Sequence, residues 1–304
     1  MNDLSAAGII GQDLRNSYSL CKRLNFEHGK TFFLATLLLP KSKRPFVHAL
    51  YGFARYADEI VDDLSSSHSL SEKSEHLQRW GQSILSDLRI GQSSDPIGRA
   101  LVDTVERFQI PHQHFEAFLL SMSMDLTITR YQTFEDLLKY VHGSAAVIGL
   151  EMLPVLGAIS NDAYVAAEKL GIAFQLANFI RDVGEDLDRG RIYLPLDELA
   201  QHGVSPEMFE KRALTPQIIS ALKEQIERVR RLQREAKNGI KLLSKESQPC
   251  IKAATELYCG IVDEVEAVGY DIFRVRVRTP RTRRLKVAGM AYLQTLPYRF
   301  RAPW

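Results

Sequence analysis

Residues 170–191 read LGIAFQLANFIRDVGEDLDRGR and join two segments of opposite character. The first segment, 170–180, is nearly all apolar, which is typical of a buried helix. The second, 181–191, contains four acids and three arginines. Burying a carboxylate is costly unless a cation or hydrogen-bond donors compensate for the lost solvation. This stretch therefore predicts a buried helix whose acidic end requires a counter-charge.

The remainder of the chain repeats the helical pattern. Apolar residues recur at spacings of three and four in 46–64, residues 71–88 are amphipathic, and 217–243 form a long charged segment of helical periodicity. Few alternating runs typical of strands occur, and no obvious linker divides the chain. The predicted fold class is therefore all-α. We expect a single domain over 1–304 with a basic C-terminal segment at 274–304.

Composition and charge narrow the class of protein. The 304 residues are 45% hydrophobic and 25% charged, and the net charge of +2 does not indicate a nucleic-acid partner. The three cysteines, Cys21, Cys250 and Cys259, lack metal-type spacing and predict reduced core thiols. The apolar runs 31–39 and 143–159 are too short or too interrupted to predict a membrane span. We expect a cytoplasmic protein without a secretory signal peptide.

Two acidic clusters carry the strongest chemical signal. Asp58 and Asp62 lie four residues apart, so a helix places both carboxylates on one face. Asn178, Asp182 and Asp186 repeat the same spacing on the second helix. Like charges at this spacing repel each other, and hard divalent cations relieve the repulsion. The clusters therefore indicate Mg²⁺ sites, although each alone has a simpler interpretation as a solvated helix end.

An arginine stands directly upstream of each cluster, at Arg55 and Arg181. A guanidinium beside metal-binding acids suits an anionic substrate such as phosphate or diphosphate. The chain has no G-x-x-x-x-G-K-[ST] loop, no G-x-G-x-x-G after a strand and no G-x-S-x-G elbow. The pattern thus favours metal-bound phosphate or diphosphate chemistry over nucleotide binding or serine hydrolysis.

Five stretches of the chain resemble the squalene/phytoene synthase family. The two signature regions are ALYGFARYADEIVDD (49–63) and LGIAFQLANFIRDVGEDLDRGRIYLP (170–195). Supporting similarity lies in 28–40, 124–152 and 257–273. The resemblance implies an all-α isoprenoid-synthase fold, a single-layer helical bundle around a large central active-site cavity.

The resemblance implies a prenyltransferase that joins two prenyl diphosphates head to head through a cyclopropyl diphosphate intermediate. Residues 269–285 resemble the phytoene synthase branch, which uses two geranylgeranyl diphosphates in the first step of carotenoid biosynthesis. The runner-up is a dehydrosqualene or squalene synthase that uses farnesyl diphosphate. A third alternative is a non-catalytic family member that acts in assembly. NADPH is not expected for the phytoene reaction.

Roles for individual residues follow from the same resemblance. The implied ligands of Mg²⁺, with Mn²⁺ as a second option, are Asp58, Asp62, Asn178, Asp182 and Asp186. The implied diphosphate-binding residues are Lys30, Thr31, Arg55, Arg181 and Arg191. The implied catalytic residues are the four aspartates together with Tyr51, Tyr140 and Tyr258, and the implied cavity wall includes Phe32, Phe174 and Gln175. Ordinary core packing is the alternative for the tyrosines.

The basic segment suggests a membrane partner. Residues 274–286 hold seven Arg or Lys in thirteen positions, without the aromatic or domain features of a nucleic-acid module. Each basic residue near an anionic lipid surface contributes about 1 kcal/mol to binding. We therefore expect peripheral association with the inner face of the membrane, and a downstream desaturase is a candidate partner. The alternative is a solvated basic surface.

Overall fold

The structure is a computed structural model that describes residues 2–62 and 69–299, without the side chains of Asp62 and Arg299. The helices are α1 (Asp3–Ala6), α2 (Gln12–His28), α3 (Lys30–Thr36), α4 (Arg44–Asp62), α5 (Leu70–Ile90), α6 (Pro96–Phe108), α7 (His112–Met124), α8 (Phe134–Val141), the π-helix η1 (His142–Ala146), α9 (Val147–Leu156), α10 (Asp162–Asp188), α11 (Leu196–Gln201), α12 (Pro206–Glu210), α13 (Pro216–Ala236), the 3₁₀-helix η2 (Lys237–Leu242), α14 (Gln248–Cys259), α15 (Ile261–Ala267) and α16 (Arg281–Arg299). These described ranges contain isolated bridges but no β-strand. The all-α prediction is confirmed.

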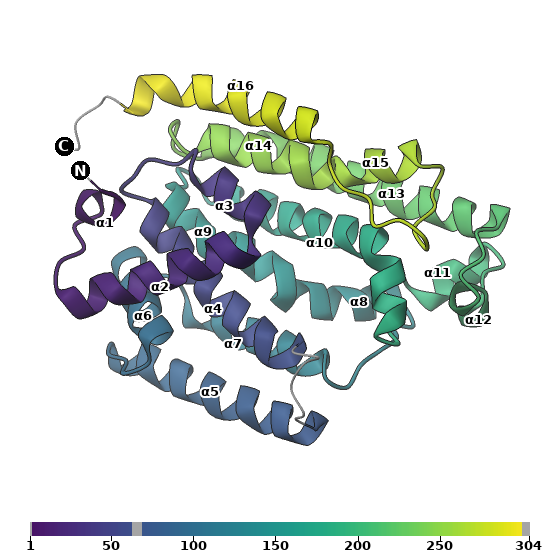
Figure 1. Cartoon of the computed structure of the whole chain (residues 1–304), viewed down its shortest axis with the longest axis horizontal. Helices are drawn as coiled ribbons and strands as arrows, with labels where there is room; N and C mark the ends of the chain where they lie inside the picture. The colour runs from purple at the N-terminus through teal and green to yellow at the C-terminus, as the bar shows by residue number, and fades with distance from the viewer. Residues whose placement is uncertain (1, 63–68, 300–304) are drawn as a thin grey trace.

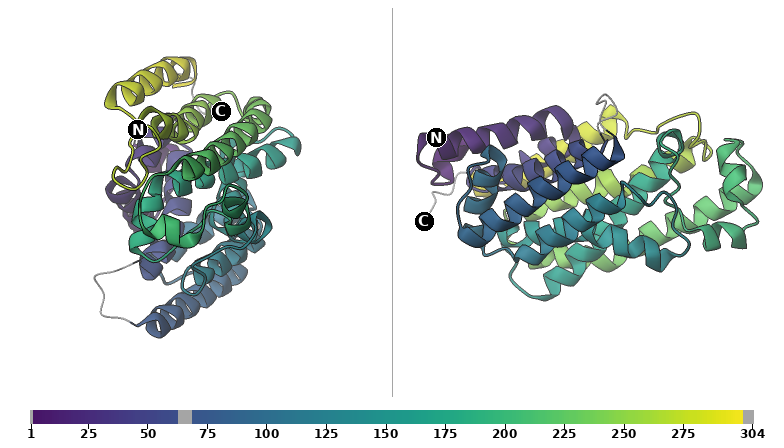
Figure 2. Two further views of the ribbon diagram at one scale, coloured as in Figure 1. Left: turned by 90° about the vertical axis from the view of Figure 1, so that its right-hand side faces the viewer. Right: turned by 90° about the horizontal axis from the view of Figure 1, so that it is seen from below.

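Helix α10 organises the molecule. It packs against α9, η1, α13, η2, α14 and α15. Figure 1 shows α10 in the middle, with α14 and α16 along one side and α4, α7 and α5 along the other. The end view in Figure 2 shows the same order, from α16 at the top to α5 at the bottom. The apolar half of the opening stretch is therefore at the centre of the fold.

Two apolar clusters hold the helices together. The first is built mainly from helices of the N-terminal half, with contributions from α14 and α16, and contains the fully buried rings of Tyr18, Phe53 and Phe115. The second surrounds the C-terminal part of α10 and contains Ile180 and Phe209. Complete burial of each such side chain stabilises the fold by about 1.5–3 kcal/mol. Because the two clusters meet along α10, they fix the position of its acidic end.

The helix expected over 217–243 ends earlier than its periodicity suggests. Helix α13 stops at Ala236 and continues as the tighter η2. Gly239 lies within η2, where a Cβ would lie 2.0 Å from the Cβ of Ala166 on α10. Only glycine permits this close approach, which brings η2 against the middle of the molecule.

Several predicted features lie partly outside the described residues. The side chain of Asp62 is outside the description, as are residues 63–68 and the end of the basic segment at 300–304. In the part of the chain that is described, no helix combines the length and apolarity needed to cross a bilayer. The single-domain organisation over 1–304 stays a prediction.

Candidate functional site

A cavity of about 500 Å³ lies among the helices of both apolar clusters. Its walls come from α3, α4, α7, α8, α9, α10, α13 and α14, together with η1 and η2. Small side chains line much of it and leave the space open, namely Ala35, Ala54, Ala145, Gly149, Ala163, Ala166, Ala167, Gly171, Gly239 and Ala254. An apolar cavity of this size accommodates a long hydrocarbon.

One end of the cavity is polar. Along α4 the lining residues change from Val47 and Leu50 to Arg55 and Asp58. Along α10 they change from Ala163 to Gln175 and Asn178. On both helices the polar residues occur toward the C-terminal end. The cavity therefore offers apolar walls to a hydrocarbon and polar groups to its head.

The first acidic cluster stands at this polar end. Arg55 Nη1 donates to Asp58 Oδ2 over 2.7 Å, and Arg55 Nε lies 3.9 Å from Glu59 Oε2. The Asp58 side chain is 43% exposed, so its carboxylate is accessible from solvent. The carboxylate of Asp62 is outside the described atoms. Arg55 thus neutralises part of the negative charge of the first acidic cluster.

Asn178 contributes a buried oxygen that needs a partner. Its Oδ1 atom has no hydrogen-bond donor among the described residues, although the residue lines the cavity. A buried unsatisfied oxygen is costly, and coordination of a hard cation would satisfy it. Carboxylate and amide oxygens are also the donor set that suits Mg²⁺. The residues present therefore fit a divalent metal.

Asp182 is held by two guanidinium groups. Arg181, its neighbour on α10, donates to both carboxylate oxygens over 2.7 and 2.6 Å. Arg276, from the segment before α16, donates to the same oxygens over 2.9 and 3.3 Å. Burial alone would raise the pKa of Asp182, but these hydrogen bonds outweigh it and hold the pKa below its ordinary value. Asp182 is therefore charged and internally neutralised.

Asp186 lies one turn further along α10, beside a small void that Arg191 also lines. Burial raises the pKa of Asp186 to about 7, and the negative charge of Asp182 adds to the rise. A cation bound nearby would lower this pKa again. No three His, Cys, Asp or Glu residues of the described part already form a metal-type group.

Tyr51 and Tyr258 line the cavity near its polar end, each beside a phenylalanine. The rings of Tyr51 and Phe32 have centroids 5.2 Å apart, and those of Tyr258 and Phe174 stack at 4.9 Å. Burial raises the pKa of Tyr51 to about 12, and burial also raises the pKa of Tyr258. Both phenols are neutral near pH 7. Their ring faces are suited to stabilising a cation.

Tyr140 is the third cavity tyrosine, and Asp125 holds its hydroxyl group. Tyr140 donates to Asp125 Oδ2 over 2.7 Å, while Tyr193 donates to Asp125 Oδ1 over 2.9 Å. Arg191 donates to the backbone oxygen of Asp125 over 2.8 Å. Burial raises the pKa of Tyr140 well above its ordinary value, and the charge of Asp125 adds to this. The hydroxyl proton of Tyr140 is therefore engaged in the hydrogen bond to Asp125.

The other expected residues divide into two groups. Phe32, Phe174 and Gln175 line the cavity, as expected of wall residues. Lys30 and Thr31 form the first turn of α3 and do not line it; Lys30 is exposed and Thr31 half-buried. Arg181 and Arg191 also lie outside the lining residues and contact Asp182 and Asp125, respectively. A direct role for these four residues in diphosphate binding stays a prediction.

Three residues that contact the predicted site residues or each other are not indicated by the sequence patterns. Asp125 lies in the range 124–152 that resembles the family, but it belongs to neither acidic cluster, so its sequence context indicates no role. Tyr193 follows the second cluster and was not singled out from its surroundings. Arg276 was counted within the basic segment, whereas its side chain contacts Asp182 and Glu185. None of these pairings is readable from spacing, because the partners are far apart along the chain.

Comparisons with known proteins agree with this arrangement. The family model described as Squalene/phytoene synthase matches residues 26–283. The chain is 39% identical to the chloroplastic phytoene synthase of Daucus carota, covering 95% of this chain and 74% of that one. It is 37% identical to the chloroplastic phytoene synthase 2 of Solanum lycopersicum, covering 97% and 95% of the two chains.

A solved structure shares the fold. A dehydrosqualene synthase crystallised in complex with a ligand superposes with a TM-score of 0.84 and 27% sequence identity, covering 93% of this chain and 99% of that one. The two acidic stretches, the helical cavity and these matches define a single class of protein. The chain belongs to the squalene/phytoene synthase family.

Proposed function

We propose that this chain is a prenyltransferase of the phytoene synthase type. It condenses two geranylgeranyl diphosphates head to head, through a cyclopropylcarbinyl (prephytoene) diphosphate, and releases two diphosphates. The observation that carries the proposal is an apolar cavity whose polar end presents Arg55, Asp58 and Asn178. The phytoene synthases at 37–39% identity over most of the chain support the C20 substrate.

A divalent metal is part of the proposal. Members of the squalene/phytoene synthase family generally require a divalent metal ion. We assign Mg²⁺ to Asp58 and Asp62 from α4 and to Asn178, Asp182 and Asp186 from α10. Bound there, the metal would act as a Lewis acid that neutralises the charge of the departing diphosphate. Mn²⁺ is a suitable replacement because it prefers the same oxygen ligands.

The protein supplies the remaining stabilisation. Arg55 and Arg181 lie beside the metal-ligand carboxylates, where their guanidiniums can address diphosphate oxygens in a bidentate manner. The apolar wall excludes water, which would otherwise trap the allylic carbocation. Tyr51 and Tyr258 present ring faces to the developing positive charge. Tyr140 acts through its ring or as a hydrogen-bond acceptor, because its proton is directed to Asp125.

The substrate preference is directly testable. Purified protein with Mg²⁺ should convert geranylgeranyl diphosphate into a C40 hydrocarbon with a kcat/KM at least about tenfold above that for farnesyl diphosphate, since one isoprene unit of apolar contact contributes a few kcal/mol. Mass spectrometry of the extracted products measures this. A C30 product without any C40 would instead support the alternative of a dehydrosqualene or squalene synthase. The structural similarity to a dehydrosqualene synthase, with a TM-score of 0.84, is the reason to test this alternative.

We also propose a peripheral membrane location on the inner face, where the apolar product and a downstream desaturase would be accommodated. Helix α16 presents large apolar side chains to solvent: Leu285 is 73% exposed and Leu293 64% exposed. Arg281 and Lys286 are exposed on the same helix. A helix that exposes large apolar side chains together with basic residues is suited to an anionic lipid surface.

Co-sedimentation with vesicles measures this association. Replacing Leu285 and Leu293 together by serine should lower binding to anionic vesicles at least about tenfold, because two apolar side chains lose their burial in lipid. Ile90→Ser is the control, since Ile90 is equally exposed on α5 at the opposite edge of the fold. Equal binding to neutral and anionic vesicles would contradict the proposed surface.

A further inference from the structure

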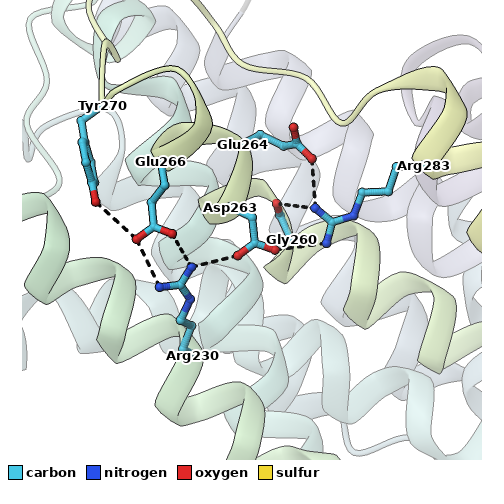
Figure 3. A network of polar contacts seen from close by, with 7 residues as sticks. All are labelled: Arg230, Gly260, Asp263, Glu264, Glu266, Tyr270 and Arg283. Atoms are coloured by element: carbon cyan, nitrogen blue, oxygen red, sulfur yellow. Dashed lines mark hydrogen bonds and ion pairs between the residues drawn. The ribbon is translucent and has the colours of Figure 1, made fainter.

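Arg276 stands in a segment that is fixed at both ends. Residues 271–280 form most of the connection between α15, which ends at Ala267, and α16. Before the segment, the Tyr270 hydroxyl donates to Glu266 over 3.4 Å. After it, Arg283 donates to Asp263 over 3.1 Å. Figure 3 shows these contacts as one network on α15. The segment is therefore anchored against the fold even though its arginines reach solvent.

The same network extends to α13. Arg230 Nη2 lies 2.9 Å from Asp263 Oδ1 and 2.5 Å from Glu266 Oε2, so one guanidinium joins two carboxylates of α15 (Figure 3). Arg283 additionally donates to Glu264 over 2.9 Å. Charge-assisted contacts of this kind are stronger than neutral hydrogen bonds. They hold α15, and with it the start of the segment, in a defined position.

The segment lies directly on the acidic end of α10. A Cβ at Gly184 would come within 3.0 Å of the backbone oxygen of Ile272 and 3.2 Å of that of Phe273. The side chains of Ile272 and Phe273 are buried. This close packing at Gly184 brings Arg276 beside Asp182, which precedes Gly184 by two residues. The contact between them follows from backbone packing and not from a chance surface encounter.

The hydrogen-bonding capacity of the Asp182 carboxylate is fully used. Each of its two oxygens accepts one hydrogen bond from Arg181 and one from Arg276. A carboxylate has about four lone-pair sites, so direct metal coordination requires a guanidinium to leave. The Arg276 side chain is 41% exposed and its contacts are longer, whereas Arg181 is 19% exposed. Arg276 is therefore the group that is displaced at lower cost.

Arg276 also compensates a second acid. Its Nη1 atom lies 3.3 Å from Oε1 of Glu185, whose side chain is 48% exposed. One guanidinium thus neutralises two carboxylates of the acidic end of α10. When it is displaced from Asp182, it would remain beside the acidic end of α10, since its segment is anchored. A guanidinium matches phosphate oxygens in bidentate geometry.

We propose that Arg276 is an exchangeable counter-ion. Without substrate it occupies Asp182 and opposes binding of the metal alone; with a metal–diphosphate complex it transfers to the diphosphate and leaves Asp182 to the metal. Metal and diphosphate therefore bind cooperatively through one arginine. The inference depends on the proposed function because it takes Asp182 to be a metal ligand.

Calorimetric titration with Mn²⁺ tests the exchange without turnover. The full chain is compared with Arg276→Gln, Arg276→Lys and, as matched control, Arg278→Gln, an exposed arginine of the same segment that forms no ion pair with any described residue. In Arg276→Gln, Mn²⁺ alone should bind about fivefold tighter, the equilibrium factor of a partly exposed ion pair. Arg276→Lys should be intermediate, because an ammonium lacks the bidentate geometry.

The same titration is then repeated with inorganic diphosphate. Diphosphate should strengthen Mn²⁺ binding in the unaltered chain and in Arg278→Gln, and this gain should shrink about fivefold in Arg276→Gln. An unchanged affinity for Mn²⁺ alone in Arg276→Gln would overturn the inference, and so would an undiminished gain from diphosphate. Asp182→Asn distinguishes failure of the Arg276 exchange from failure of the metal assignment. If this variant binds Mn²⁺ as tightly as the unaltered chain, Asp182 is not a metal ligand and the metal assignment itself fails.

Discussion

Replacing Asp58 and Asp182 together by asparagine should lower kcat by at least about a thousandfold. The variant would lose the metal charge that stabilises the leaving diphosphate, and with it about 4 kcal/mol of transition-state stabilisation. Each substitution removes one charged oxygen ligand, from α4 and from α10, respectively. We expect the double variant to fold. Asp58 is 43% exposed, and weakening the contacts of Asp182 with Arg181 and Arg276 should lower the free energy of unfolding by about 1–2 kcal/mol. Steady-state assays with geranylgeranyl diphosphate and thermal unfolding measure the two effects.

Asp188→Asn is the matched control for this loss. Asp188 is the last residue of α10, its side chain is 65% exposed, and it pairs with Arg212. The same chemical change there should leave kcat within about twofold of the unaltered chain, as expected for an exposed ion pair outside the site. Full activity in the Asp58/Asp182 double variant would contradict the metal assignment. It would also revive the alternative of a non-catalytic assembly protein.

Ala163→Leu should convert the substrate preference from C20 toward C15. Ala163 lines the apolar part of the cavity and precedes Asn178 by fifteen residues on α10, about 22 Å along the helix axis. A leucine at this position fills space that the end of the longer prenyl chain would occupy. We expect kcat/KM for geranylgeranyl diphosphate to fall about a hundredfold, while that for farnesyl diphosphate changes little.

Ala163→Ser is the control for this substitution, because it keeps the volume small at the same position. It should keep the C20 preference of the unaltered chain. Competition assays with both diphosphates, followed by mass spectrometry of the C30 and C40 products, measure the ratio directly. An equal loss with both substrates in Ala163→Leu would mean that the apolar end of the cavity does not measure chain length.

Local patterns predict the elements that carry the site. The periodicity of 46–64 corresponds to α4, and the apolar run before the second cluster forms the core of α10. Because α10 continues to Asp188, the i, i+4 and i+8 spacing of Asn178, Asp182 and Asp186 falls on one uninterrupted helix. These features depend on residues close together in the chain, which is why sequence alone is sufficient for them.

Pairings between distant residues are not available from the sequence. Asp125 contacts Tyr193 across 68 positions, and Arg276 contacts Asp182 across 94. Both depend on how helices pack, and packing is set by many small contacts that leave no local signature. The basic segment is an example: two of its arginines, Arg276 and Arg283, form ion pairs within the fold, and the composition of the segment indicates neither pairing.

Anomalous diffraction from crystals grown with Mn²⁺ and an unreactive thio analogue of geranylgeranyl diphosphate tests the central claim most directly. The account predicts manganese peaks at the polar end of the cavity, one of them about 2.1 Å from Asn178 Oδ1, with the diphosphate bridging the Asp58 and Asp182 sides and the prenyl chain running toward Ala163. Manganese bound away from both acidic clusters, or a diphosphate at the apolar end of the cavity, would contradict it.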